Sequence, residues 1–442
     1  MKKFKLFIYT DLALTIILLG VLLGWKVLIQ EETPGFFIIG VSVLLVISAV
    51  FCVISAAAID RGHGRLITRL WMSLFALVIF YFLADCVGGL IFIRPIPFHN
   101  FPDEYLHHKM PPRMRYVLRD PDSGAEFEMV TNNLGFRGGD VLEKNPGTYR
   151  IVITGDSFTM GDGLRDSDAF PLHLDRLLNE SGNGRYEVIN CGVVSYTPLL
   201  EYLLLKKYIG LLKPDMVILS FDMSDLLQEY VYRKIASTDE SGDVTAVDGY
   251  TEYDKRKSSL YLKSLVWIRQ NMFITSSIIE ILGRRFGNDE IADVDVVDVV
   301  DRQNRMLLLH TLDAPQLKES AEMYRMVEDS ILRAKRLCDK HGCKFIFSVY
   351  PWGHQVNERE WTPGRYDFIP RDTRISDRTF EELGRFAREN GIVFFNAFTA
   401  FRGYTGGEPL YFSHDPHWTP AGQRLMAESL AGFIEEDLKK GD

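Results

Sequence analysis

The sequence predicts a three-layer α/β/α domain on a roughly five-stranded parallel sheet, preceded by three transmembrane helices. Two observations support this fold class. Three apolar runs of 23 or 24 residues lie within the first 100 residues. Beyond residue 146, short runs rich in β-branched and aromatic residues alternate with helical patterns. Such alternation is typical of a parallel sheet that helices cover on both faces.

The three apolar runs define a membrane anchor over residues 1–95. They cover residues 6–29, 36–58 and 70–93, and each is long enough to cross a hydrocarbon core of about 30 Å as a helix. A cleaved signal peptide is the competing interpretation of the first run. That run is too long, and no small-residue cleavage site follows it cleanly, so we expect it to be retained.

Basic residues predict how the anchor is oriented, because cytoplasmic loops carry an excess of Lys and Arg. Such residues precede the first span and lie between the second and third: Lys2, Lys3, Lys5, Arg61, Arg65 and Arg69. We therefore expect a multi-pass protein of the plasma (inner) membrane with a cytoplasmic N-terminus. Three crossings place everything after about residue 95 in the periplasm or outside the cell.

The charge of the exported part excludes one class of partner. Residues 1–100 hold 8 Lys and Arg and 5 Asp and Glu, which leaves 42 against 54 for the rest of the chain. An excess of acidic residues argues against nucleic-acid binding.

Three cysteines belong to the part that we expect to be exported, where disulfides form: Cys191, Cys338 and Cys343. Whether Cys338 and Cys343 form a bridge is left open, because sequence does not give its geometry.

A connector rich in Pro and Gly, residues 96–146, leads to the catalytic part, residues 147–442. The expected strands cover residues 149–154, 186–190, 216–221, 344–350 and 392–395. The expected helices cover residues 169–178, 199–212, 317–340, 377–389 and 420–439.

A long insertion interrupts this alternation at about residues 226–316. It contains an acidic stretch, residues 238–255, and an apolar stretch, residues 260–282. Insertions of this length in α/β enzymes are often lids or specificity elements. A surface or membrane-facing embellishment is the alternative, and the sequence does not choose between them.

The first strand of this part runs into Gly155-Asp156-Ser157, which places Ser157 at the carboxyl end of a parallel strand. Ligands bind at that end of such sheets. A serine hydroxyl becomes nucleophilic when a base lies within hydrogen-bond reach and a third group orients that base. A serine before a helix can also be a plain N-cap, so the tripeptide alone does not decide.

The base and its carboxylate are predicted just before the final helix. His417 and Asp415 lie in one loop, which Pro416 and Pro420 stiffen. The same loop could instead bind zinc through His414, Asp415 and His417, but no further group of metal ligands stands out. We therefore expect a catalytic Ser157, His417 and Asp415, with no metal and no cofactor.

Together these motifs resemble the SGNH, or GDSL, hydrolase superfamily, over roughly residues 130–440. Gly155-Asp156-Ser157 resembles its nucleophile block, Asn190-Cys191-Gly192 its second block and Asp415-Pro416-His417 its last block. The resemblance implies a flavodoxin-like sheet and, with the anchor, a membrane-anchored branch linked to acylation or deacylation of cell-envelope glycans. It also implies that Gly192 donates to the oxyanion.

The third block departs from the family pattern, because Ser224 stands where the family has asparagine. The oxyanion donors implied are thus the backbone N–H groups of Ser157 and Gly192 and the Ser224 hydroxyl. Losing one good donor costs on the order of 2.7 to 4 kcal/mol in the transition state. Asn133-Leu134-Gly135-Phe136-Arg137 also resembles a segment of membrane-linked members, and we expect Arg137 to pack at the domain edge rather than line the site.

The function expected is a serine esterase that acts on O-acyl groups, foremost O-acetyl groups, of a cell-envelope or extracellular polysaccharide. An O-acyltransferase or a lipid esterase would use the same triad, and a non-catalytic glycan-binding or assembly component would keep the fold without turnover. The expected partners are an acylated or lipid-linked glycan, the lipid bilayer and envelope polysaccharide machinery. Trp352 and Trp418 could stack on sugars or pack in the core.

Overall fold

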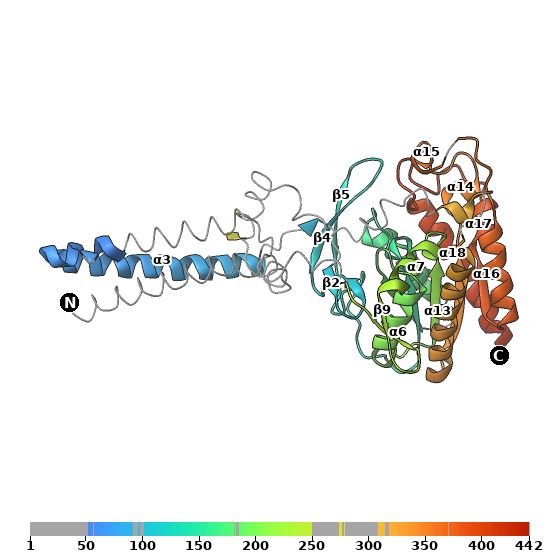
Figure 1. The fold of residues 1–442 in the computed structure, drawn as a ribbon, viewed down its shortest axis with the longest axis horizontal. Coiled ribbons are helices and arrows are strands. Elements are labelled where there is room, and N and C mark those ends of the chain that lie inside the picture. The colour runs from blue at the N-terminus through green and yellow to red at the C-terminus, as the bar shows by residue number, and fades with distance from the viewer. Residues whose placement is uncertain are drawn as a thin grey trace. The chain divides into compact units, whose positions relative to one another are not determined.

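The computed structural model describes residues 52–55, 57–91, 96–97, 101–180, 182, 185–249, 274–275, 278, 308–313, 318–369 and 371–441. The chain divides into two compact units. The smaller unit contains residues 1–94 and 250–293, and the α/β unit contains residues 95–249 and 294–442. Figure 1 draws the elements in chain order by colour.

A five-stranded parallel sheet forms the centre of the α/β unit and confirms the predicted sheet. Its strand order is β12-β11-β8-β6-β7, and every neighbouring pair is parallel. The strands begin and end within two residues of the predicted ranges: β6 Thr148–Gly155, β7 Arg185–Gly192, β8 Met216–Phe221, β11 Lys344–Val349 and β12 Val393–Asn396. All six residues of β8 are buried, as expected of a strand covered on both faces.

Helices cover both faces of this sheet. The chain moves from β6 outward to β7 and then back past β6 to β8, and right-handed crossovers in opposite directions place their helices on opposite faces. Accordingly α5 packs with α18, whereas α6 packs with α13 and α7. The long helices are α5 Phe170–Glu180, α6 Pro198–Leu212, α7 Asp225–Ile235, α13 Ser320–His341, α16 Arg378–Glu389 and α18 Pro420–Gly441.

Shorter helical turns lie in the loops of the α/β unit. They are α4 Ser157–Met160, η2 Asp166–Asp168, η4 Leu309–Thr311, α14 Gly353–Val356, α15 Arg365–Phe368 and α17 Ala397–Arg402. Of these, α4 follows the first sheet strand directly and begins at the candidate nucleophile.

The predicted connector folds into short strands that belong to the α/β unit. Strands β2 Phe101–Asp103 and β3 His107–Lys109 form one hairpin. Strands β4 Arg115–Arg119 and β5 Glu126–Val130 form a second, and β1 Ile96–Pro97 joins it along β4.

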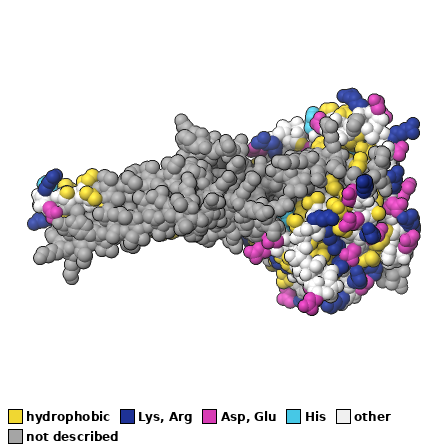
Figure 2. All heavy atoms as spheres, viewed as in Figure 1, with side chains coloured by type: hydrophobic (Ala, Val, Ile, Leu, Met, Phe, Trp, Pro, Cys, Tyr) yellow, Lys and Arg dark blue, Asp and Glu magenta, His cyan; other side chains and the backbone are white. Residues whose placement is uncertain are grey.

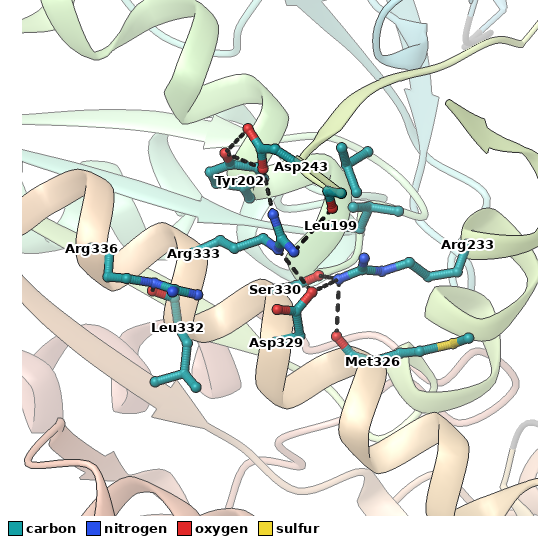
Figure 3. Close-up of polar contacts among 12 residues, drawn as sticks. Leu199, Tyr202, Arg233, Asp243, Met326, Asp329, Ser330, Leu332, Arg333 and Arg336 are labelled. Carbon is teal, nitrogen blue, oxygen red and sulfur yellow. Dashed lines mark hydrogen bonds and ion pairs between the residues drawn. The ribbon is translucent and has the colours of Figure 1, made fainter. Parts of the chain in front are cut away.

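The first part of the predicted insertion is held to the α/β unit by an ion-pair network (Figure 3). Arg333 of α13 donates to Asp243, which lies between strands β9 Ala236–Thr238 and β10 Val244–Val247, over 2.5 Å. Arg333 and Arg233 both donate to Asp329 over 2.8 Å. The α/β unit therefore extends to residue 249, beyond the predicted start of the insertion at residue 226. The apolar stretch 260–282 lies almost entirely outside the described residues.

In the smaller unit, α3 Gly64–Ile91 follows a π-helical turn, η1 Ile59–His63. Residues Ile59–Asp85 are long and apolar enough to cross a membrane. They overlap the third predicted span but begin before residue 70. The first predicted span lies outside the described residues, and the second lies largely outside them.

Asp85 is the acidic residue of this helix, and its side chain is fully buried. Its carboxylate accepts hydrogen bonds from the hydroxyl and the backbone N–H of Thr275, the latter over 3.2 Å. A buried carboxylate is tolerated when donors satisfy it.

Basic and acidic side chains are interspersed over the visible face of the α/β unit (Figure 2).

Candidate active site

A tight turn presents Ser157 at the carboxyl end of β6. Asp156 caps α4, because its side chain accepts the backbone N–H of Phe158 over 2.9 Å. The turn requires glycine before it, since a Cβ at Gly155 would lie 2.2 Å from the Thr159 hydroxyl oxygen. Ser157 is the first residue of the helix and 8% exposed. Its N–H is therefore one of the first-turn donors that no carbonyl of the helix accepts.

The structure brings Ser157, His417 and Asp415 together in one hydrogen-bonded chain. The Ser157 hydroxyl lies 2.7 Å from Nε2 of His417, and Nδ1 of His417 lies 2.5 Å from Oδ1 of Asp415. A carboxylate only accepts, so Nδ1 carries the proton and Nε2 is left to accept the serine proton. This is the arrangement by which a serine is made nucleophilic.

The short Asp-x-His spacing is accommodated by a local turn. The backbone N–H of His417 donates over 2.9 Å to the same Asp415 oxygen that its ring contacts. Asp side chains commonly accept an N–H two residues further along the chain. One carboxylate oxygen thus fixes both the turn and the orientation of the imidazole.

Charge around the imidazole favours its protonated form. Burial alone would lower the pKa of His417, but the charge and hydrogen bond of Asp415 raise it to about 9, with smaller contributions from Asp162 and Asp156. The pKa of Asp415 is lowered, because the pairing with His417 outweighs its burial. The site is therefore built to stabilise an imidazolium, the species that forms when His417 takes the serine proton.

Asp156 has a structural set of contacts. Its carboxyl accepts the Tyr350 hydroxyl over 2.9 Å, and burial together with the neighbouring Asp222 holds its pKa well above the usual range. Asp222 in turn accepts the backbone N–H of Ser224. These contacts join the nucleophile turn to the turn that begins α7.

One of the three predicted oxyanion donors, the backbone N–H of Gly192, is already engaged by a neighbouring side chain. The backbone N–H of Gly192 donates over 2.9 Å to the side chain of Asn190. A Cβ at Gly192 would lie 2.4 Å from the Met160 backbone nitrogen, so this glycine is needed for close packing against α4. Ser224 is 5% exposed and precedes α7. The N–H of Ser157 remains the best placed of the set.

The two tryptophans near the site pack in the core. Trp418 is 0% exposed and Trp352 is 6% exposed. Both rings contact Phe158, which also lies against the imidazole of His417 with 4.8 Å between ring centroids. These indoles thus support the loop of His417, and a sugar-stacking role is not available to them in this arrangement.

The alternative metal site does not assemble. The His414 side chain is 67% exposed, and its Nδ1 contacts the hydroxyl of Ser413 over 2.9 Å, whereas the ring of His417 contacts Ser157 and Asp415. Within the described part of the chain, no group of three or more His, Cys, Asp or Glu side chains could hold a metal ion.

The disulfide bridge that the sequence left open between Cys338 and Cys343 is not formed, because both are free thiols.

Contacts from the connector are the part of the site that the sequence did not reveal. Arg137 is 1% exposed and donates to backbone carbonyls of the loop after α4, so it packs inside the unit rather than at its edge. Asp122 accepts hydrogen bonds from the loop that carries His417. The Arg137 segment carried a sequence signal, whereas a lone aspartate in a turn carried none.

No protein-family model and no curated protein matches the chain. Among solved structures, TesA is 13% identical with a TM-score of 0.33, over 64% of this chain and 95% of its own. A lipase/acylhydrolase from Enterococcus faecalis is 13% identical (TM-score 0.34, 65% and 96%). An acetyl xylan esterase is 12% identical (TM-score 0.33, 64% and 99%). Likenesses this low assign no activity, so the function is argued from the site itself.

Proposed function

We propose that the protein is a serine esterase in which Ser157 is the nucleophile, His417 the general base and Asp415 the residue that orients it. The observation that carries the proposal is the hydrogen-bonded chain of 2.7 Å and 2.5 Å through the two ring nitrogens of His417. This series of hydrogen bonds starts at Ser157, on a sharp strand-to-helix turn at the carboxyl end of β6.

The reaction follows from that geometry. The Ser157 oxygen attacks the carbonyl carbon of an ester, and its proton passes to Nε2 of His417. The N–H of Ser157, with Ser224 as a second donor, stabilises the negative charge on the carbonyl oxygen. When the C–O bond breaks, His417 returns the proton to the departing alcohol. Water or a sugar hydroxyl then attacks the acyl-enzyme by the same steps in reverse and frees Ser157.

The proposed substrate is an O-acyl, foremost O-acetyl, group of a cell-envelope or extracellular polysaccharide. The support is the placement of the α/β unit after an apolar helix, with basic residues that predict an outward-facing catalytic part. Hydrolase and O-acyltransferase share the triad, and exclusion of water from the acyl-enzyme decides between them. A lipid esterase is the other enzyme of this class.

The test is labelling with a fluorophosphonate, which reacts with activated serines, on the purified full-length chain. We expect labelling of the wild-type protein and hydrolysis of p-nitrophenyl acetate, with activity falling as the acyl chain lengthens from two to eight carbons. Rising activity along that series would favour a lipid esterase. The absence of both labelling and hydrolysis would contradict the catalytic proposal and would favour a glycan-binding component.

Localisation is proposed on the same grounds and has its own test. Reporter fusions after residues 30, 64 and 110 should read outside, cytoplasm and outside in turn. A matched fusion after residue 442 should agree with the one after residue 110, because the sequence between them predicts no further span. A cytoplasmic signal at residue 110 would refute the orientation and the envelope-glycan substrate with it.

A further inference from the structure

One segment of the predicted connector, residues 96–146, contacts three loops at or near the candidate active site. We name it the brace, residues 101–137, which contains both hairpins and ends at Arg137. Its contacts reach the loop of His417, the loop that follows Ser157 and the loop that follows β7. All of them lie within the α/β unit.

The first contact joins the tip of the β4–β5 hairpin to the loop of the catalytic base. Asp122 accepts the backbone N–H of Ser413 over 2.9 Å and the Ser413 hydroxyl over 2.7 Å. The backbone N–H of His414 donates to the same carboxylate over 3.4 Å. Asp122 therefore holds the chain immediately before Asp415.

The second contact joins the end of the brace to the loop after Ser157. The Arg137 guanidinium donates to the carbonyl of Leu164 over 2.5 Å, to that of Met160 over 3.2 Å and to that of Gly161. It also pairs with Asp166 over 2.8 Å. One buried side chain thus satisfies three carbonyls that the short helix α4 and its loop leave without helical partners.

The third contact joins the β2–β3 hairpin to the loop after β7. Nε2 of His108 lies 2.7 Å from the carbonyl of Val194, and the Tyr196 hydroxyl donates back to the His108 carbonyl over 2.8 Å. His108 is fully buried, and burial lowers its pKa to about 4, so the ring is neutral. Its Nδ1 then accepts from Nδ1 of His107 over 2.9 Å.

We propose that the brace is a built-in part of the active site, in which Asp122, Arg137 and His108 act as positioning residues that hold the three loops in register. The inference rests on the proposed function for its catalytic consequence. Loops that are ordered before the substrate binds lose no further conformational entropy in the transition state. A small misplacement of the catalytic base can lower the rate about a hundredfold.

The most selective test is Asp122→Ala in the full-length protein, because Asp122 lies on a surface turn and is not part of the core. We expect hydrogen–deuterium exchange to accelerate at least about tenfold in residues 410–419, and fluorophosphonate labelling to slow about tenfold to a hundredfold. The KM for a small acetyl ester should barely change while kcat falls. Asp122→Asn should restore part of the rate, because its amide oxygen still accepts.

A matched control removes a carboxylate from the same hairpin without touching the loop. Glu126 pairs with Arg119 at the surface, and Glu126→Ala should alter neither exchange nor labelling. Unchanged hydrogen–deuterium exchange at residues 410–419 in Asp122→Ala would overturn the proposed role of the brace, whatever the labelling and hydrolysis rates of the variant. Faster exchange with an unchanged labelling rate would likewise overturn its catalytic role. If the wild-type protein is not labelled at all, the proposed function fails, while exchange still decides whether the brace holds the loop.

Discussion

Replacing Ser157 with alanine should lower kcat for acetyl ester hydrolysis by about 10⁶-fold. The hydroxyl is the group that forms the covalent bond to the acyl carbon, and no other nucleophile is hydrogen-bonded to His417 in the structure's described residues. A weak residual rate should persist, because the oxyanion donor and substrate binding survive the change. Burst kinetics with p-nitrophenyl acetate, which count the acyl-enzyme formed, measure the loss directly.

The matched control is Ser167→Ala, an exposed serine whose hydroxyl donates to the neighbouring Asp168. It should retain the wild-type rate and burst. Circular dichroism should be superimposable for both variants, since Ser157→Ala removes a single oxygen. A Ser157→Ala protein that still produces a full burst would mean that another residue is acylated.

The sheet was predictable because its strands are covered on both faces. Residues 216–221 form an uninterrupted apolar and β-branched run apart from Ser220, and all of them are buried as β8. Gly342 adopts a left-handed conformation with φ of 70° just before β11, as glycine commonly does at the end of a helix. A short apolar run bounded by turn residues indicates a buried strand, and the sheet strands show this pattern.

The grouping of Ser157, His417 and Asp415 was predictable from their positions, since Ser157 follows a strand and His417 precedes the last helix. The availability of Gly192 was not, because a neighbouring side chain, Asn190, takes its N–H. Sequence shows which backbone groups a motif could offer. It does not show which of them a local side chain has already engaged.

The role of the connector could not be read from the sequence either. Its prolines and glycines predicted a connector, whereas the described residues of this segment form five short strands. The contact between Asp122 and Ser413 spans 291 residues of chain, so it leaves no periodic signal near either residue. Docking of this kind depends on tertiary placement, which a pass along one sequence does not supply.

Asp415→Asn should lower kcat by about 10⁴-fold at neutral pH, because an amide no longer holds Nδ1 as the donor and no longer stabilises the imidazolium. In the wild-type protein His417 must be neutral to accept the serine proton, and its pKa is about 9. The wild-type rate should therefore rise about tenfold per pH unit below that value and level off above it. A pH profile of kcat/KM for a neutral acetyl ester reports this pKa in the free enzyme.

The variant should shift that profile in a fixed direction. Removing the Asp415 charge leaves burial, which lowers the pKa of His417, so the midpoint should move to lower pH. The wild-type protein gains stability from binding the His417 proton below the unfolded pKa of about 6.5 and loses it as pH rises through 9. Asp415→Asn should flatten this pH dependence of the melting temperature. A profile whose midpoint is unchanged in the variant would show that Asp415 does not govern the base, and the triad would have to be reassigned.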